Sequence, residues 1–253
     1  MRKMVVAVTA MFVLGLAALA YAQQVNTYEV EASTSPTKAG TKKKPVPVGL
    51  KFGYTVSEAS GNRPSPVKKY SIRFAGMRVN TSVPGKCTLG KLEDGGAEAC
   101  PKDSIVGEGY IRNETGATAN PADKSIKCNA KLWVVNLGSS KASIYVAGSP
   151  EATDEREKCQ IQLAAPIPAK FTTRGSMSSL DFTVPSSLLH PGAATISNAV
   201  VAVESSIKKI KKGGKGFFES IGGCKGGKRA VEVVFTPESG SAKTGKTTAR
   251  CSS

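Results

Sequence analysis

The sequence predicts a secreted all-β protein, an antiparallel β-sandwich-like double sheet with long disulfide-closed loops. Three observations lead to this class. Apolar and polar residues alternate in several short segments, which is the pattern of half-buried strands. No segment of about a dozen residues has the spacing of an amphipathic helix. All six cysteines follow an N-terminal export signal, so we expect them to be oxidised in pairs.

The first 22 residues have the composition of a signal peptide. Arg2 and Lys3 give a positive start, Met4 to Leu19 is largely apolar, and Ala20-Tyr21-Ala22 supplies the small residues of a cleavage site. A retained membrane helix is the alternative, but an apolar run of about sixteen residues is short for a bilayer. We therefore expect cleavage after Ala22 and no transmembrane segment after signal removal.

The cysteines are expected to form disulfides in an oxidising compartment. Zinc is the rival interpretation, but the sequence has no CxxC pair and a single histidine, so a closed four-ligand site is poorly supplied. Six cysteines allow 15 pairings, and the sequence does not choose among them. We expect pairing between neighbours, which closes three short loops: Cys87–Cys100, Cys128–Cys159 and Cys224–Cys251.

The first elements can be placed by alternation. Gln23 to Ala32 opens the fold as a strand. Ser33 to Val48 is rich in proline and lysine, so it is expected to be an extended surface segment or a linker and not a buried strand. Period-two alternation then predicts strands at Leu50–Val56 and at Tyr70–Phe74, separated by a turn-rich stretch.

The central part is organised around Cys87 to Gly109, which we interpret as a disulfide-closed loop that leads into a strand. Two more strands follow at Val106–Asn113 and Lys127–Leu137. Within the second, the apolar run Leu132–Val135 predicts a central strand covered on both faces. Asn136 to Ala142 is expected to be the hairpin connection to a strand that continues to residue 147.

The last strands are predicted at Cys159–Leu163, Leu180–Val184 and Val231–Phe235, where alternation is again clear. Ile196–Ile207 fits a helix or a strand, and its valine content favours a strand. The length suits one large β domain or two small ones. We expect a single secreted domain over residues 23–253.

Three segments carry a family resemblance. They are Ser35–Pro45, the run from Cys100-Pro101 to Ser104-Ile105-Val106-Gly107, and the closing arrangement from Cys224 through Val231–Phe235 to Cys251. Together they resemble an uncharacterised group of secreted proteins from soil actinobacteria, and they span most of the mature chain. The resemblance implies secretion, cysteine pairing and β structure. The group carries no activity to transfer, so the resemblance implies no site residues.

Two features of the sequence resemble motifs for nucleotide binding or catalysis. Residues 240–247 fit the phosphate-binding pattern G-x-x-x-x-G-K-[ST], but too few residues follow for the helix that such a site needs. We interpret them as a polar loop. His190 lies in a turn, and no G-x-S-x-G context accompanies it, so a structural histidine is favoured over a catalytic one.

The remaining candidates are weaker. Glu151, Asp154, Glu155 and Glu157 lack the spacing of a calcium loop and are interleaved with basic residues, so a solvated loop is expected. Asn80 and Asn113 each begin a glycosylation sequon, which matters only in a eukaryotic host. We assign no catalytic, cofactor-binding or metal-binding residues.

A basic stretch between Ile207 and Arg229 is the best candidate for a contact surface. The formal net charge is +16, and removing Arg2 and Lys3 leaves +14. Such a charge attracts anionic partners whatever the fold. The expected contact with a polyanion, either an anionic cell-wall polymer or a membrane surface, is made by five lysines: Lys208, Lys209, Lys211, Lys212 and Lys215. A solubilising loop is the competing interpretation and the favoured one, and nothing indicates specific nucleic-acid binding.

Two function classes remain. The first is a non-enzymatic extracellular or cell-envelope module, structural, adhesive or polyanion-contacting. The alternative is a secreted hydrolase whose site is assembled from scattered residues and cannot be identified from the sequence.

Overall fold

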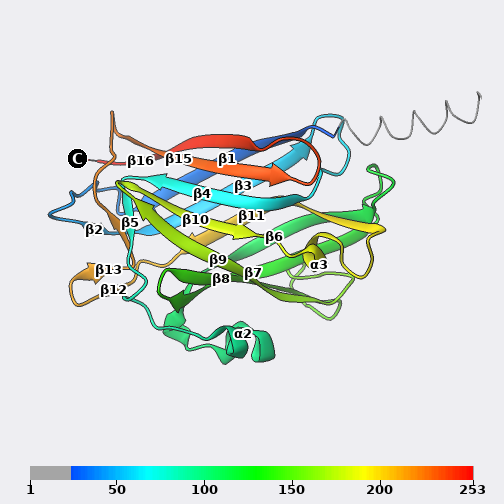
Figure 1. The fold of residues 1–253 in the computed structure, drawn as a ribbon, viewed down its shortest axis with the longest axis horizontal. Helices are drawn as coiled ribbons and strands as arrows, with labels where there is room; N and C mark the ends of the chain where they lie inside the picture. Colours follow the sequence, from blue (N-terminus) through cyan, green and yellow to red (C-terminus); the bar gives the residue numbers. More distant parts are fainter. Residues whose placement is uncertain (1–23, 253) are drawn as a thin grey trace, which may run out of the picture.

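Eleven antiparallel strands form one continuous sheet that makes up the body of the protein (Figure 1). The structure is a computed structural model that describes residues 24–252, so the export signal predicted over residues 1–22 lies outside the described residues. The spatial order of the sheet is β1, β3, β11, β6, β7, β8, β9, β10, β4, β15, β16. Its strands, in chain order, are β1 (Asn26–Ser35), β3 (Gly49–Glu58), β4 (Val67–Ala75), β6 (Ile105–Ala117), β7 (Ile126–Gly138), β8 (Lys141–Gly148), β9 (Leu163–Arg174), β10 (Met177–Thr183), β11 (Ile196–Ile207), β15 (Lys228–Pro237) and β16 (Lys243–Arg250).

The alternation in sequence produces one buried and one exposed face on most of these strands. In β3, the inward side chains Leu50, Phe52 and Tyr54 are at most 7% exposed. In β15, Val231, Val233 and Phe235 are almost completely buried. The all-β, antiparallel class is therefore confirmed, and Ile196–Ile207 is a strand.

The sheet curls until its two outer strands meet. The Tyr28 ring on β1 stacks on the Phe235 ring on β15, with the ring centroids 4.1 Å apart. Lys243, at the start of β16, donates from Nζ to the Asn26 carbonyl on β1 at 3.4 Å. Figure 1 shows β1 beside β15 and β16. The two layers expected from the sequence thus belong to one continuous sheet, whose halves face each other across the core.

Small elements lie at the two ends of the curled sheet (Figure 1). At one end a three-stranded sheet is formed by β2 (Val46–Pro47), β14 (Phe218–Ser220) and β5 (Met77–Val79), beside the hairpin β12 (Lys211–Lys212) and β13 (Lys215–Gly216). At the other end lies the short helix α3 (Ser186–Leu189), whose Leu188 and Leu189 are buried. The interior is therefore covered at both ends.

All three disulfides join neighbouring cysteines, as expected: Cys87–Cys100, Cys128–Cys159 and Cys224–Cys251. The first closes the loop that holds α2 (Leu89–Gly95), η1 (Ala97–Ala99) and, just beyond it, η2 (Lys102–Ser104). This loop covers the outer face of β7, where Leu92 packs with Trp133 and Val135. Leu132 and Val134 face the main core, so β7 is covered on both faces, as predicted.

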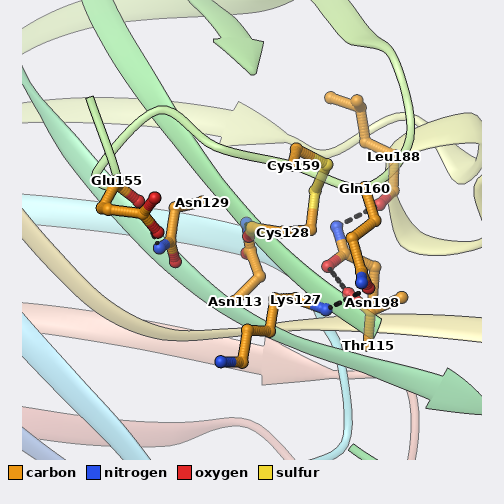
Figure 2. Close-up of a disulfide and its surroundings, with 10 residues drawn as sticks. All are labelled: Asn113, Thr115, Lys127, Cys128, Asn129, Glu155, Cys159, Gln160, Leu188 and Asn198. Atoms are coloured by element: carbon orange, nitrogen blue, oxygen red, sulfur yellow. Dashed lines mark hydrogen bonds between the residues drawn. A yellow bond between two sulfur atoms is a disulfide. The ribbon is translucent and has the colours of Figure 1, made fainter. Parts of the chain in front are cut away.

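The second disulfide fastens the loop between β8 and β9 to β7 (Figure 2). Gln160 Oε1 accepts from the Lys127 backbone N–H at 2.9 Å, and Asn129 Nδ2 donates to the Glu155 carbonyl at 2.8 Å. The strand predicted at Cys159–Leu163 is wrong. Cys159 makes an isolated bridge to Cys128, and the strand begins at Leu163 and continues to Arg174.

The proline- and lysine-rich segment 33–48 is extended but is not a free linker. Its first residues complete β1, and Ala39 is only 5% exposed. The Ala39 N–H donates to the Ser252 carbonyl at 2.7 Å, and its own carbonyl accepts from the Gly222 N–H at 3.1 Å. The segment therefore packs against both β14 and the C-terminal strand region.

Candidate functional site

The lysine-rich part of the basic stretch forms a short hairpin. Lys211 pairs with Gly216 and Lys212 pairs with Lys215, so β12 and β13 are adjacent antiparallel strands. The two residues between them, Gly213 and Gly214, have φ values of 56° and 79°. A two-residue turn with positive φ at both positions matches the twist of a hairpin and favours glycine. The glycines thus shape the hairpin.

Polar side chains around the buried Glu219 fix the base of this hairpin. Glu219 is completely buried, and its Oε1 accepts from the Gly216 N–H at 2.8 Å. Its Oε2 accepts from Arg78 Nε at 2.9 Å. Asn80 Nδ2 donates to the Gly216 carbonyl at 2.7 Å. Burial alone would raise the pKa of Glu219, but the hydrogen bonds from Gly216, Arg78 and Asn80 hold it below its ordinary value, so the carboxylate stays charged.

These anchoring residues were not predicted from the sequence. Glu219 is the single acidic residue between Ile207 and Arg229. A lone carboxylate in a basic stretch is a usable signal that it has a fixed partner, but nothing in the sequence points to Arg78 or Asn80, which lie far away in the chain.

All five predicted contact lysines are exposed: Lys208, Lys209, Lys211, Lys212 and Lys215. We call them the lysine surface. Within residues 24–252, one ion pair involves the lysine surface. In it, Lys208 Nζ lies 3.5 Å from Glu108 Oε1. The loop before β2 adds the exposed residues Lys42, Lys43 and Lys44 at the same end of the sheet (Figure 1). The structure therefore gathers positive charge from two distant segments.

Other residues of the basic stretch do not belong to the lysine surface. Phe217 and Phe218 are at most 3% exposed and pack against Phe171 in the core. Arg229 is 1% exposed, and its guanidinium donates to the Ser220 hydroxyl and, at 3.2 Å, to the Gly222 carbonyl. Burial lowers the pKa of Arg229. The aromatic and arginine side chains of the basic stretch are thus internal.

His190 is held by acceptors on both ring nitrogens. Nδ1 lies 2.9 Å from the Ile196 carbonyl oxygen and Nε2 lies 3.0 Å from Glu238 Oε1. A carbonyl and a carboxylate only accept, so the arrangement favours the imidazolium, which donates from both nitrogens. Burial by itself lowers the pKa of His190, but these two hydrogen bonds outweigh it and raise the pKa above the ordinary 6.5. In this state His190 has no nitrogen to receive a serine proton.

The hollow around His190 has a volume of about 200 Å³ and includes Ser65, Ser197 and Ser239. Serines are therefore near the histidine, as a hydrolase would need. The ring nitrogens, however, are turned to Ile196 and Glu238, so the geometry is that of a structural clamp between the segment after α3 and the end of β15.

The acidic residues after β8 are mostly paired with basic neighbours. Arg156 Nη2 lies 2.6 Å from Asp154 Oδ2, Lys158 Nζ lies 3.2 Å from Glu155 Oε1, and Lys131 Nζ lies 3.7 Å from Glu157 Oε1. The Arg156 hydrogen bonds hold the pKa of Asp154 at about 2. Across residues 24–252, no group of three or more His, Cys, Asp or Glu side chains is arranged to hold a metal ion.

Most of the phosphate-loop match lies in a β-strand. Lys243 to Thr247 lie in β16, which pairs with β15 along its whole length. Lys246 Nζ lies 3.6 Å from Glu232 Oε1 on β15. The prediction of a polar loop is therefore wrong for these residues, and the strand leaves no helix N-terminus for a phosphate.

Comparison with known proteins adds no identity: no family model and no curated protein matches this chain. In the part of the chain that the structure describes, no helix is both long and apolar enough to cross a membrane.

Proposed function

We propose that this chain is a non-enzymatic extracellular or cell-envelope module that contacts an anionic cell-wall polymer through the lysine surface. One observation carries the proposal. Five exposed lysines lie on and beside a hairpin whose base is fixed by the buried carboxylate of Glu219. A fixed base keeps the ammonium groups together at one end of the molecule.

A polymer fits this surface better than a lipid bilayer. The hairpin tip consists of glycine and lysine, and the neighbouring Phe217 and Phe218 are buried. Segments that dock to membranes usually combine basic residues with exposed apolar side chains. Among residues 24–252 the exposed large apolar side chains are Val25 and Leu89, and neither is on the hairpin. Lysines without apolar anchors suit the phosphate or carboxylate groups of an extended polymer.

Electrostatic attraction supplies the driving force. The mature chain carries a net charge of +14 once the two basic residues of the export signal are removed. Ammonium groups act as point charges on flexible stems, so they adapt to irregular anion spacing. The attraction is screened over about 8 Å at physiological ionic strength, and binding should therefore weaken steeply with salt.

The test is co-sedimentation with purified cell wall at rising salt concentration. The variant changes Lys208, Lys209, Lys211 and Lys212 to Gln. A matched control changes four exposed lysines of the main sheet to Gln: Lys68, Lys69, Lys141 and Lys170. We expect the first variant to lose most of the binding and its salt dependence. The control loses the same charge, so it should retain more binding if the position of the lysines matters.

Equal losses in the two variants would show that only net charge matters and would overturn the assignment to the lysine surface. Tighter binding to anionic vesicles than to cell wall would replace the polymer by a lipid partner.

A further inference from the structure

The curled sheet encloses a cavity of about 120 Å³. Its lining is mainly Val, Ile, Leu and Phe side chains from both halves of the sheet. Leu188 of α3 borders it at one end and Phe218 of β14 at the other. Interiors are normally packed with few voids larger than a water molecule. A space of this size is therefore a feature of the fold that needs an explanation.

Some lining side chains on neighbouring strands are small or polar. Ala130 on β7, Asn113 on β6 and Ser205 on β11 all line the cavity. β6 lies between the other two strands in the sheet. Larger apolar residues occupy the corresponding inward positions elsewhere, such as Leu132 and Val134 on β7. The β11–β6–β7 part of the wall thus contributes small and polar side chains to the lining.

Asn113 places an unpaired acceptor on this wall. Its side chain is 8% exposed, and its Nδ2 donates to the Cys128 carbonyl at 2.7 Å. Its Oδ1 is buried and has no hydrogen-bond partner. A buried polar atom without a partner is costly and rare in native structures.

The neighbouring Asn198 shows the contrast (Figure 2). Its Oδ1 accepts from the Thr115 hydroxyl at 2.6 Å, and its Nδ2 donates to the Leu188 carbonyl at 2.9 Å. Both ends of that amide are therefore used to hold α3 over the cavity. Asn113, on the same strand as Thr115, uses only one end.

We propose that the cavity binds a small apolar molecule with one hydrogen-bond donor. Its O–H or N–H donates a hydrogen bond to Asn113 Oδ1. A cavity of roughly 150 Å³ lined by apolar side chains is known to hold benzene, so this volume suits a single small ring or a short alkyl group. A water molecule fits less well, because an ordered internal water needs about two to four polar partners and this lining is mostly apolar. The site is independent of the lysine surface.

Phenol and toluene are the probes, because they have nearly the same shape and differ in the hydroxyl donor. We expect saturable binding of phenol to the wild-type protein by calorimetry. Ala130→Leu fills the cavity and should abolish binding of both probes. Val234→Leu, on the outer face of β15 and outside the lining, is the control and should bind like wild type. Phenol binding that survives Ala130→Leu, or no binding of either probe to wild type, would overturn the proposal.

The role of Asn113 is tested by the ratio of the two affinities. The hydrogen bond should shift the ratio of phenol to toluene affinity by roughly 3- to 10-fold in favour of phenol. In Asn113→Leu this shift should disappear. An unchanged ratio would remove Asn113 from the site.

Because Asn113→Leu also removes the contact to Cys128 and can impair folding, a crystal structure of the wild-type protein with phenol gives a second readout. Phenol oxygen within hydrogen-bond distance of Asn113 Oδ1 is the expected result. Phenol elsewhere on the protein would contradict the site.

Discussion

At the scale of single residues, His190 is held between two hydrogen-bond acceptors. Both of its nitrogens face acceptors, so folding stabilises the protonated ring. The pKa of the ring is raised in the folded protein relative to the ordinary value of 6.5. A raised folded pKa means that the stabilisation is fully present below the unfolded pKa and is lost as the pH rises through the folded pKa.

We therefore predict that the free energy of unfolding decreases as the pH rises from the ordinary histidine range upward. Urea denaturation at a series of pH values above 6 should show this slope for wild type. His190→Gln keeps a hydrogen-bonding side chain that does not titrate, and the slope should largely vanish. An NMR titration that places the His190 pKa at or below 6.5 would contradict the prediction.

Glu219 is a buried carboxylate whose hydrogen bonds fix the hairpin that carries the lysine surface. Glu219→Ala removes one partner of the ion pair and the acceptor for the Gly216 N–H. We expect a loss of about 2 kcal/mol, below the roughly 3–5 kcal/mol of a fully buried pair, because Arg78 is 39% exposed and can be hydrated. The measurement is urea denaturation.

The same variant should free the hairpin, so trypsin should cleave after Lys211, Lys212 and Lys215 faster than in wild type. Glu232→Gln, which removes the exposed pair with Lys246, is the matched control and should change stability by less than about 0.5 kcal/mol. Equal behaviour of the two variants would show that Glu219 does not fix the hairpin.

At the scale of elements, the α2 loop and its disulfide protect Trp133. Trp133 is the single tryptophan of the sequence, and its ring packs with Leu92, Val135 and Tyr145 beneath the loop. Replacing Cys87 and Cys100 by Ala should loosen the loop and shift the tryptophan fluorescence to longer wavelength, because the indole becomes more hydrated. Replacing Cys224 and Cys251 is the control, since this disulfide lies outside the Trp133 cluster. An unchanged spectrum in the first variant would mean that the loop stays docked without its disulfide.

The same scale shows why one long strand was not predicted. Pro166 and Pro168 interrupt the alternation after Leu163, and proline cannot donate to a strand ladder. In the structure both lie in the first half of β9, which pairs with β8 but extends beyond β10, because the β10 pairing begins at Ala169. The prolines therefore sit where a missing N–H removes no ladder bond. Only the register of the neighbouring strand reveals this, and the sequence of β9 does not contain it.

At the scale of the whole molecule, local patterns predicted most long strands and the neighbour disulfides, but not the closure of the sheet. Alternation records which side of a strand is buried, so it identified β3, β4, β10 and β15. A continuous apolar run indicated the centre of β7, and valine content favoured β11 as a strand. The curl depends on contacts between distant segments, such as Tyr28 with Phe235. The cavity is lined by side chains from distant strands, and Asn113 and Ala130 in that lining look like ordinary strand residues in the sequence. The lysine surface was predicted because its charges are contiguous, whereas its anchors Arg78 and Asn80 were not.

The contact that closes the sheet can be tested directly. The Tyr28 and Phe235 rings are stacked with centroids 4.1 Å apart and an interplanar angle of 11°. Tyr28→Ala should cost about 2 kcal/mol, less than the roughly 3–5 kcal/mol of a fully buried aromatic residue, because Tyr28 is only half-buried. Tyr28→Phe keeps the stack and should cost much less.

Hydrogen exchange then distinguishes closure of the sheet from local packing of the two rings. If the stack holds the two outer strands together, Tyr28→Ala should reduce the protection of β1 and of β16 together while the central strands β6 and β7 keep theirs. Loss of protection in β1 alone would mean that β16 is held by β15 and that the stack does not close the sheet.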